Sequence, residues 1–341
     1  MFQPQYTITA RLLANIKRIT NLVSQLNHHR FPHVVLMQLE QTARAISTYA
    51  STSIEGNPLP LTEVKKILKS TPAHLRDSEK EVLNYNQALQ DLGHKLKAGS
   101  TTLSLEFILT IHKQVTAGLL PKFESGRLRA KPVVVNDPAT RQVIYLPPDA
   151  KDVPRLLDEL IHFINSHRYN VDPLILAGIF HKHMVLIHPF MDGNGRAARL
   201  ITKMLLAQMD LNTFNLFSFE NYYNTNVTKY FQTVGEFGNY YELADKIEFT
   251  SWLEYFTAGI IDELLRVQQQ LTTFSATPET ELKPYHQKLL KFIKSKGFIA
   301  DRDYAQLTHR AKATRALDFQ KLIALGLITK KGQGRATYYI L

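Results

Sequence analysis

The sequence predicts a mainly α-helical protein, with one β-hairpin near the middle of the chain and a small mixed α+β module at its C-terminal end. Apolar residues recur at three- and four-residue spacing along most of the chain, as they do on one face of an amphipathic helix. Two β-prone runs flank a turn-forming segment near residue 138. The last part of the chain combines short helical patterns with a closing pair of strands.

The helical pattern is clearest in residues 1–100, which we expect to form an N-terminal helical region. Apolar positions from Leu12 to Leu26 share one helical face. A second helical pattern over residues 34–52 ends at Glu55-Gly56-Asn57-Pro58, because Gly, Asn and Pro disfavour a continuing helix. Helical spacing returns in the segments that follow, up to about residue 119.

A hairpin is predicted in the middle of the chain. Lys131–Val135 and Arg141–Leu146 are the two β-prone runs, and residues 136–140 form a five-residue turn between them. Pro147-Pro148 ends the second strand. Helices are expected again over residues 153–166 and 174–187, and a further one begins near residue 196.

The composition narrows the class of protein. Of the 341 residues, 44% are hydrophobic, which is enough for real cores and excludes a disordered or fibrous protein. The absence of cysteine excludes disulfides, thiol nucleophiles and cysteine-ligated metals. No apolar run approaches the ~20 residues that span a bilayer, and the first twenty residues lack the apolar stretch of a signal peptide. We therefore expect a cytoplasmic protein without membrane contact.

The C-terminal module holds most of the net charge. Residues 282–341 contain thirteen Lys and Arg against three Asp, a balance of +10 in a chain whose total is +11. Residues 271–281, rich in Thr, Ser and Pro, are the predicted linker to it. The order of three short helices and a basic hairpin is that of a winged-helix domain. We expect DNA as a partner of this module, with a solubilising surface or a protein contact as the alternative. The predicted phosphate contacts are Lys312, Arg315, Lys321, Lys330, Lys331 and Arg335.

A short glycine-containing segment points to phosphate binding. Gly193-Asn194-Gly195 stands between an apolar helical segment and a following helix. Glycines let successive backbone N–H groups turn toward one anion, and a helix N-terminus adds partial positive charge there. Arg196 and Arg199 project from one face of the first turn, and two guanidiniums beside such a nest suit a polyphosphate.

Two residues just before the nest complete the chemistry of a nucleotide site. Asp192 offers a hard carboxylate that could hold Mg²⁺ against the phosphates. His188, with an ordinary pKa of ~6.5, is mostly neutral at pH 7 and able to accept a hydroxyl proton. His181 and His183 do not extend this into a zinc site, because residues two apart on a helix face apart; His181 is expected to pack or to orient its neighbours.

The whole segment resembles the Fic family. The sequence reads His188-Pro-Phe-Met-Asp-Gly-Asn-Gly-Arg-Ala-Ala-Arg199, which fits the Fic signature His-x-Phe-x-Asp/Glu-Gly-Asn-Gly-Arg-x-x-Arg at every fixed position. The resemblance extends to the hairpin at 131–146, which corresponds to the family's target-docking flap, and to the helix around Trp252. It implies a Fic-fold helical core over residues 101–270, with the winged helix at 282–341 as a separate domain.

The resemblance implies a protein adenylyltransferase that uses Mg-ATP. His188 would deprotonate a Ser, Thr or Tyr hydroxyl of a target protein docked on the flap, and Asp192 would hold Mg²⁺. Gly193, Asn194 and Gly195 would cradle the phosphates, Arg196 and Arg199 would bind the outer ones, and Phe190 would be buried under the loop. A Tyr-Tyr pair lines the adenine pocket in family members. Its best match here is Tyr230-Phe231, which departs from that pattern.

A second family element lies upstream. Ser51-Thr52-Ser53-Ile54-Glu55-Gly56 fits the inhibitory motif Ser/Thr-x-x-x-Glu-Gly/Asn of the self-inhibited Fic class. The implied mechanism is that Glu55 pairs with Arg199 and displaces the γ-phosphate from its productive position. A homodimer is a further expectation by family analogy.

Other functions stay open at the level of the sequence. The second hypothesis is a DNA-associated regulator whose Fic core senses nucleotide, modifies itself or removes AMP. Known Fic proteins also transfer UMP, phosphate or phosphocholine, but the complete motif favours transfer of AMP.

Overall fold

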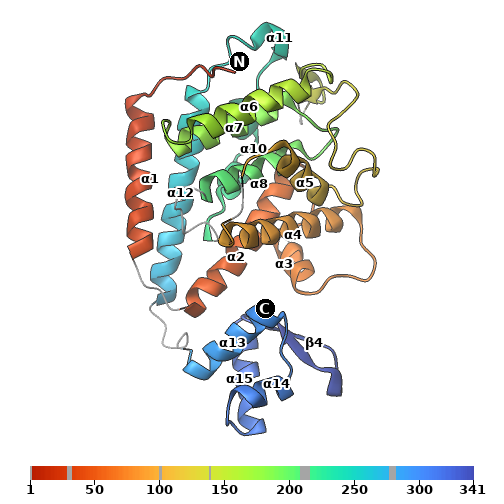
Figure 1. Ribbon diagram of the computed structural model, residues 1–341, viewed down its shortest axis with the longest axis vertical. Helices are drawn as coiled ribbons and strands as arrows, with labels where there is room; N and C mark the ends of the chain where they lie inside the picture. The colour runs from red at the N-terminus through yellow and green to blue at the C-terminus, as the bar shows by residue number, and fades with distance from the viewer. Residues whose placement is uncertain (1, 29–32, 100–101, 138–139, 208–215, 276–281) are drawn as a thin grey trace. The chain divides into compact units, whose positions relative to one another are not determined.

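The computed structural model describes residues 2–28, 33–99, 102–137, 140–207, 216–275 and 282–341 (Figure 1). Helices dominate it and the strands are short, so the mainly helical fold class predicted from the sequence is confirmed. The chain divides into two compact units. Unit 1 comprises Met1–His28 and Ala43–Arg266, and unit 2 comprises His29–Thr42 and Val267–Leu341.

Unit 1 contains the helices that surround the glycine segment at residues 193–195 and the hairpin. They are α1 (Ala10–His28), most of α2 (His33–Ile54), α3 (Leu61–Lys69), α4 (Asp77–Lys97), α5 (Leu105–Val115), α6 (Val153–His167), α7 (Pro173–Ile187), α8 (Asn194–Ala207), α9 (Phe219–Thr225), α10 (Val227–Val234), α11 (Tyr240–Leu243) and most of α12 (Thr250–Ser275).

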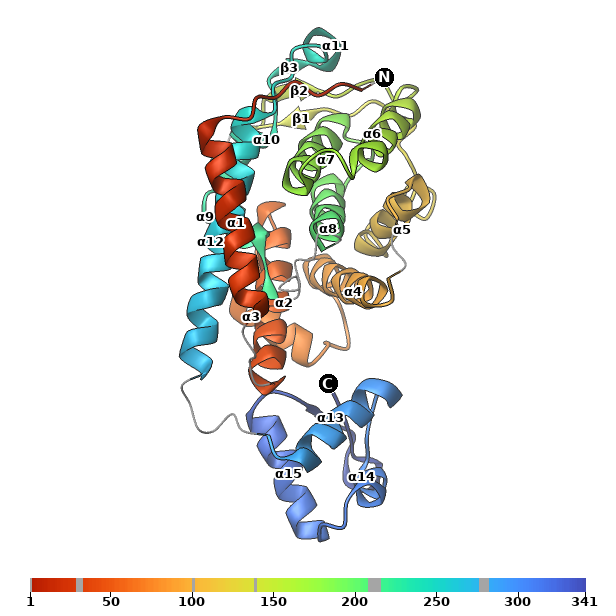
Figure 2. The ribbon, with the colours of Figure 1, turned by 60° about the vertical axis from the view of Figure 1, so that its left-hand side comes forward.

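Helices α7 and α8 form the centre of unit 1. Nearly every residue of α7 is buried, because its sequence is apolar on all faces, as expected of a helix inside a core. The helix starts sharply, since Asp172 Oδ1 accepts from the Leu174 N–H at 2.8 Å and Pro173 occupies the first turn. Helix α8 packs against α7, and α6 covers α7 while α4 and α5 cover α8 (Figure 2).

Helices α1 and α12 lie side by side along one flank of unit 1 (Figures 1 and 2). Thr9 Oγ1 donates to Glu254 Oε1 at 2.6 Å, and Asn15 Nδ2 donates to Thr257 Oγ1 at 3.0 Å. Helix α12 also packs on α7, where Trp252 Nε1 donates to the Gly178 carbonyl at 2.8 Å. The N-terminal helix is therefore attached to the core through α12.

The hairpin is part of a three-stranded sheet. Strands β1 (Val135–Asn136) and β2 (Val143–Leu146) are antiparallel, and β3 (Gly238–Asn239) adds to β2 in parallel. The paired strands are shorter than predicted, because Pro132 offers no N–H to a ladder and the register shifts between Val135 and Asn136. The sequence pattern did not indicate β3. Residues 138–139 of the predicted turn lie outside the described residues.

Unit 2 has the element order predicted for it. Helices α13 (Pro284–Lys296), α14 (Asp301–Leu307) and α15 (Lys312–Ala324) precede the antiparallel strands β4 (Thr329–Lys331) and β5 (Tyr338–Ile340). A short 3₁₀ helix, Gly334–Ala336, lies between the strands. The core of this unit centres on Leu289, Ile293, Phe319, Leu322 and Leu327. Its classification as a winged helix stays a prediction.

The structure differs from the predicted linker at its start. Residues 271–275 continue α12, because Leu271 extends the buried face of that helix and is 1% exposed. Residues 276–281 lie outside the described residues. The domain boundaries at residues 100, 270 and 281 stay predictions. Within the described ranges, no helix is both long and apolar enough to cross a bilayer.

The close packing of α7 on α12 depends on a glycine. A Cβ at residue 178 would lie 2.5 Å from Leu253 Cδ2 and 3.2 Å from Phe256 Cδ1. We expect Gly178→Ala to lower the free energy of unfolding by about 1–3 kcal/mol, despite the better helix propensity of alanine. Urea unfolding measures this difference, and an unchanged or higher stability would contradict the packing argument.

Candidate active site

The loop between α7 and α8 begins at His188. This residue ends α7 in the left-handed conformation, with φ 50° and ψ 60°. Its N–H donates to the Met184 carbonyl at 3.2 Å, and its ring Nδ1 lies 3.2 Å from the Val185 carbonyl. This contact assigns the ring proton to Nδ1 and leaves Nε2 as an acceptor. Burial lowers the pKa of His188 below its ordinary value, so the ring is neutral at pH 7.

The same loop is closed by Asn194, the first residue of α8. Its Oδ1 accepts from the Phe190 N–H and its Nδ2 donates to the Phe190 carbonyl, both at 2.9 Å. Phe190 itself is fully buried. Gly193 has a φ of 80°, and a Cβ there would lie 2.8 Å from Thr116 Cγ2, so glycine is required by both conformation and space. The loop is therefore rigidly shaped just where the N–H groups of α8 begin.

A histidine that sequence reasoning missed supports this loop. His112 of α5 donates from Nε2 to the Asp192 carbonyl at 2.9 Å, and its Nδ1 accepts from the Gly126 N–H at 3.0 Å. Its ring stacks on Phe190 with a centroid distance of 3.6 Å. Burial lowers the pKa of His112 to about 4, so the ring stays neutral. It lies far from the motif in sequence, and no local spacing indicates its role.

The guanidinium of Arg199 is completely buried and faces the end of α2. Its Nε donates to Ser51 Oγ at 2.7 Å, and its Nη2 donates to the Ser51 carbonyl at 2.9 Å and to Glu55 Oε1 at 2.6 Å. Glu55 approaches this closely only because residue 195 is glycine, since a Cβ there would lie 2.1 Å from Glu55 Oε1. The glycine of the nest and the glutamate of the upstream motif therefore occupy adjoining space.

Arg196 is held by two carboxylates. Its Nη2 donates to Asp192 Oδ2 at 2.8 Å, and its Nη1 lies 2.8 Å from Glu81 Oε1 of α4. Burial raises the pKa of Glu81. Arg196 Nε and Arg199 Nη1 are buried without a hydrogen-bond partner among the described residues. Unpartnered buried donors of this kind suit an anion.

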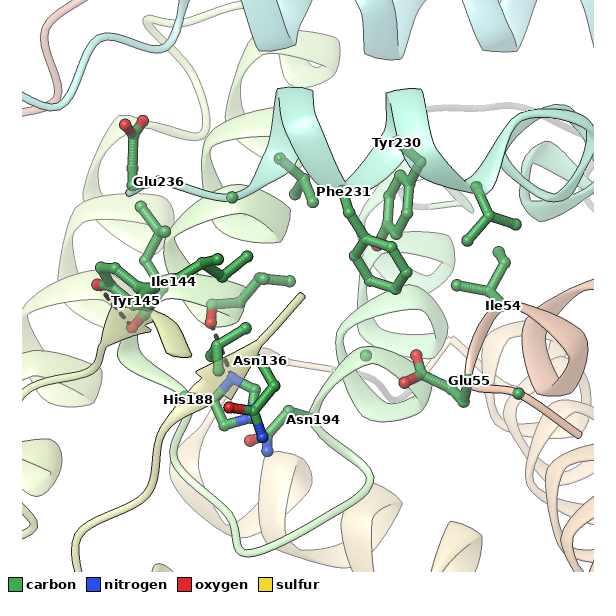
Figure 3. Close-up of a pocket in the computed structure, with 18 of the residues that line it drawn as sticks. Ile54, Glu55, Asn136, Ile144, Tyr145, His188, Asn194, Tyr230, Phe231 and Glu236 are labelled. Carbon is green, nitrogen blue, oxygen red and sulfur yellow. Dashed lines mark hydrogen bonds between the residues drawn. The ribbon is translucent and has the colours of Figure 1, made fainter. Parts of the chain in front are cut away.

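A cavity of about 420 Å³ opens beside the loop (Figure 3). Figure 3 shows Tyr230 and Phe231 extending from α10 toward it, with His188 and Asn194 from the α7–α8 loop and Glu55 at the end of α2. The predicted site residues that line it are Glu55, His188, Asn194, Gly195, Tyr230 and Phe231. Those that do not are Asp192 and Gly193 of the loop, and Arg196 and Arg199 of α8.

The aromatic wall of the cavity is fixed from behind. The Tyr230 hydroxyl donates to His181 Nε2 at 2.9 Å, and His181 Nδ1 donates to Thr202 Oγ1 at 3.0 Å. His181 is fully buried, and burial lowers its pKa. It orients Tyr230 in this way. No cluster of three or more metal-binding side chains occurs in the portion of the chain that is described.

Asp192 fits Mg²⁺ bound mainly through a nucleotide. Its side chain is 56% exposed, and only one of its oxygens is engaged by Arg196. Mg²⁺ in nucleotide sites is commonly held by one or two carboxylates together with phosphates and waters, so a single exposed carboxylate is sufficient.

The basic residues of unit 2 are mostly exposed, with one exception that matters. Lys312, Lys321 and Lys330 are exposed. Arg315 instead donates from Nε and Nη2 to the two oxygens of Asp301, both at 2.8 Å. The contact of Arg315 with a phosphate stays a prediction, and it would compete with this ion pair. Lys331 is half-buried, and the side chain of Arg335 lies outside what the structure describes.

Comparison with known proteins agrees with this geometry. Residues 102–206 match the Fic/DOC family. The chain contains a Fic domain. Its fold resembles that of a Fic family protein from Desulfovibrio desulfuricans, with a TM-score of 0.65, 20% identity and coverage of 100% of this chain and 98% of that one. It also resembles Fic-1 from Caenorhabditis elegans, with a TM-score of 0.59, 22% identity and coverage of 78% and 74%.

Curated relatives match about half of the chain. A protein adenylyltransferase Fic from Aedes aegypti is 29% identical over 213 residues, which is 57% of this chain and 41% of that protein. One from Nematostella vectensis is 32% identical over 166 residues, covering 46% and 36%. The chain thus spans about two fifths of the length of these relatives.

The buried histidine under the loop predicts a dependence of stability on pH. His112 takes up a proton near pH 6.5 when unfolded but only near pH 4 when folded, so the free energy of unfolding falls as the pH drops between these values. We expect His112→Gln to lose stability less steeply over pH 6.5–4, as measured by urea unfolding. His162→Gln, at an exposed site on α6, is the control. Equal slopes in all three proteins would contradict the prediction.

Proposed function

We propose that this protein transfers AMP from Mg-ATP to a hydroxyl group of a target protein or of itself, and that Glu55 restrains the reaction. The observation that carries the proposal is that His188 and the N-terminus of α8 open into the same cavity, which Glu55 also enters. The curated relatives named protein adenylyltransferase support the reaction type.

His188 acts as the general base in the proposed reaction. Its Nε2 accepts the proton of the acceptor hydroxyl, while Nδ1 stays directed at the Val185 carbonyl. The hydroxyl oxygen attacks the α-phosphorus of ATP, a new P–O bond forms, and the bond to the bridging oxygen of the β-phosphate breaks. Diphosphate leaves, and the protonated His188 loses its proton to solvent. The lowered pKa of His188 keeps the base neutral over the physiological range.

The nucleotide is bound by the loop and by α10. Backbone N–H groups at Gly193, Asn194 and Gly195 receive the phosphates at the positive end of α8. The unpartnered nitrogens of Arg196 and Arg199 neutralise the outer phosphates. Tyr230 and Phe231 face the adenine ring from the other side of the cavity (Figure 3). Mg²⁺ held at Asp192 would neutralise charge on the phosphates.

Glu55 limits this binding mode in two ways. Its carboxylate occupies Arg199 Nη2 at 2.6 Å, and it lies against Gly195, where a phosphate would approach the backbone. A negative charge there repels the outer phosphates.

The acceptor segment of a target docks on the open edge of β1, the outer strand of the sheet, by adding a further strand.

The test is AMP transfer from α-³²P-labelled ATP with Mg²⁺. We expect Glu55→Gly to label about ten- to a hundredfold faster than the parent, which corresponds to an inhibited state favoured by roughly 1.4–2.8 kcal/mol. The double variant Glu55→Gly with His188→Ala should transfer no label above background.

Matched controls separate these effects from general damage. Glu63→Gly removes a half-buried helical glutamate that pairs with Lys66, and His162→Ala removes an exposed histidine. Glu63→Gly should transfer AMP at the rate of the parent, and His162→Ala added to Glu55→Gly should transfer it at the rate of Glu55→Gly. A parallel reaction with labelled UTP tests transfer of UMP, and release of AMP from a modified protein tests removal of AMP. Equal labelling by Glu55→Gly and by the parent would contradict the restraint, and no AMP transfer by any variant would contradict the reaction.

A second function, DNA binding by unit 2, is favoured by its exposed lysines. We propose that Lys312 at the start of α15 and Lys330 on β4 contact phosphates. The double variant Lys312→Glu with Lys330→Glu should weaken binding to a mixed-sequence duplex at least about tenfold and reduce the salt dependence by about two ion equivalents. Lys65→Glu with Lys69→Glu, two exposed changes on α3, is the charge-matched control. Fluorescence anisotropy at several salt concentrations measures both, and equal affinities for the two double variants would overturn the proposal.

A further inference from the structure

Arg129 lies just before the β1–β2 hairpin, and it is only 4% exposed. All three of its side-chain nitrogens donate to main-chain carbonyls: Nε to His188 at 2.8 Å, Nη1 to Lys131 at 3.1 Å, and Nη2 to Pro148. Its own backbone N–H donates to the Pro189 carbonyl at 2.9 Å. One side chain therefore joins the two ends of the hairpin to the start of the α7–α8 loop.

The buried guanidinium of Arg129 contacts carbonyl oxygens instead of a carboxylate. No carboxylate in the described part of the chain lies within ion-pair distance of it; burial lowers the pKa of Arg129, and Asp149, which is farther away, partly opposes this. A buried charge without a counter-ion is unfavourable, and only good hydrogen bonds offset it. The planar fork of arginine supplies three such bonds at once in diverging directions, which lysine or a neutral side chain cannot do.

One of these bonds reaches a strained residue. His188 is one of two non-glycine residues with positive φ in the described ranges, and such a conformation persists only where the surroundings hold it. The His188 N–H donates to the Met184 carbonyl. On the carbonyl side, the described contact is Arg129 Nε.

We propose that Arg129 is a positioning residue, which locks His188 in its left-handed turn and ties the hairpin over residues 131–148 to the same anchor. The strand edge that receives the acceptor and the base that deprotonates it then keep a fixed relation. The catalytic part of this inference rests on the proposed function, whereas the mechanical link does not.

The charge of Arg129 provides a readout that a merely structural role would not move. Besides burial, three charged groups act on His188: Glu55, just after α2, and Asp192 of the loop raise its pKa, and Arg129 lowers it. Replacing the guanidinium by a neutral group therefore raises the pKa of His188. A lysine at the same place keeps the charge and loses the fork.

The kinetic experiment uses the full chain with Glu55→Gly as the background. We expect Arg129→Met to lower kcat for AMP transfer about a hundredfold with KM for ATP changed less than about threefold, and to move the acid limb of kcat/KM upward by about half a pH unit. Arg129→Lys should lower kcat without moving that limb. Arg266→Met, which removes a guanidinium bound to the buried Glu263 and remote from the cavity lining, should leave both unchanged.

Hydrogen exchange followed by mass spectrometry tests the link without any activity. Peptides covering the hairpin and the α7–α8 loop should exchange at least about tenfold faster in Arg129→Met than in the parent, and at the parent rate in Arg266→Met. Unchanged exchange in both segments would overturn the inference. If the Glu55→Gly background transfers no AMP while exchange rises as expected, the proposed function fails and the anchoring role stands. An active background whose rate Arg129→Met does not alter would overturn the positioning of His188.

Discussion

The site depends on the closure of the loop between two buried helices. Helices α7 and α8 are almost entirely inside unit 1, so the loop that joins them has little freedom, and Asn194 closes it with two hydrogen bonds to the Phe190 main chain. His112 stacks beneath Phe190 and binds the Asp192 carbonyl. The backbone N–H groups at the start of α8 consequently face one direction without further adjustment, which is the arrangement that an anion requires.

The buried arginines around this loop differ in their hydrogen-bond partners. Arg199 and Arg196 are compensated by carboxylates, Glu55 for the first, and Asp192 and Glu81 for the second. Arg129 is compensated by carbonyl oxygens. At Arg199 and Arg196 a phosphate could replace a carboxylate with little change in electrostatic energy, because one anion takes the place of another. The described side-chain hydrogen bonds of Arg129 are all to main-chain carbonyls, so no contacting carboxylate is there for a phosphate to replace.

Much of the architecture followed from local sequence. The helical periods, the central hairpin and the order of elements in unit 2 all appear near the predicted residues. Two features that the sequence did not indicate have physical causes. Leu271 continues the buried face of α12 through a stretch whose Thr and Ser content suggested a linker. Arg315 is engaged by Asp301 from α14, a partner that no spacing within α15 indicates.

The sequence alone was sufficient to propose the chemistry of the site: a histidine base at His188, a glycine nest with two arginines, and a glutamate motif upstream. These lie within short segments, where spacing and residue type are sufficient to infer a role. Which distant groups contact these segments depends on three-dimensional packing. His112 contacts the loop and Arg129 contacts His188 through segments far apart in the chain, whereas the pairing of Glu55 with Arg199 was already implied by the family resemblance. Such contacts arise from the packing of whole helices, and the local periodicity of a sequence carries no record of which helices pack together.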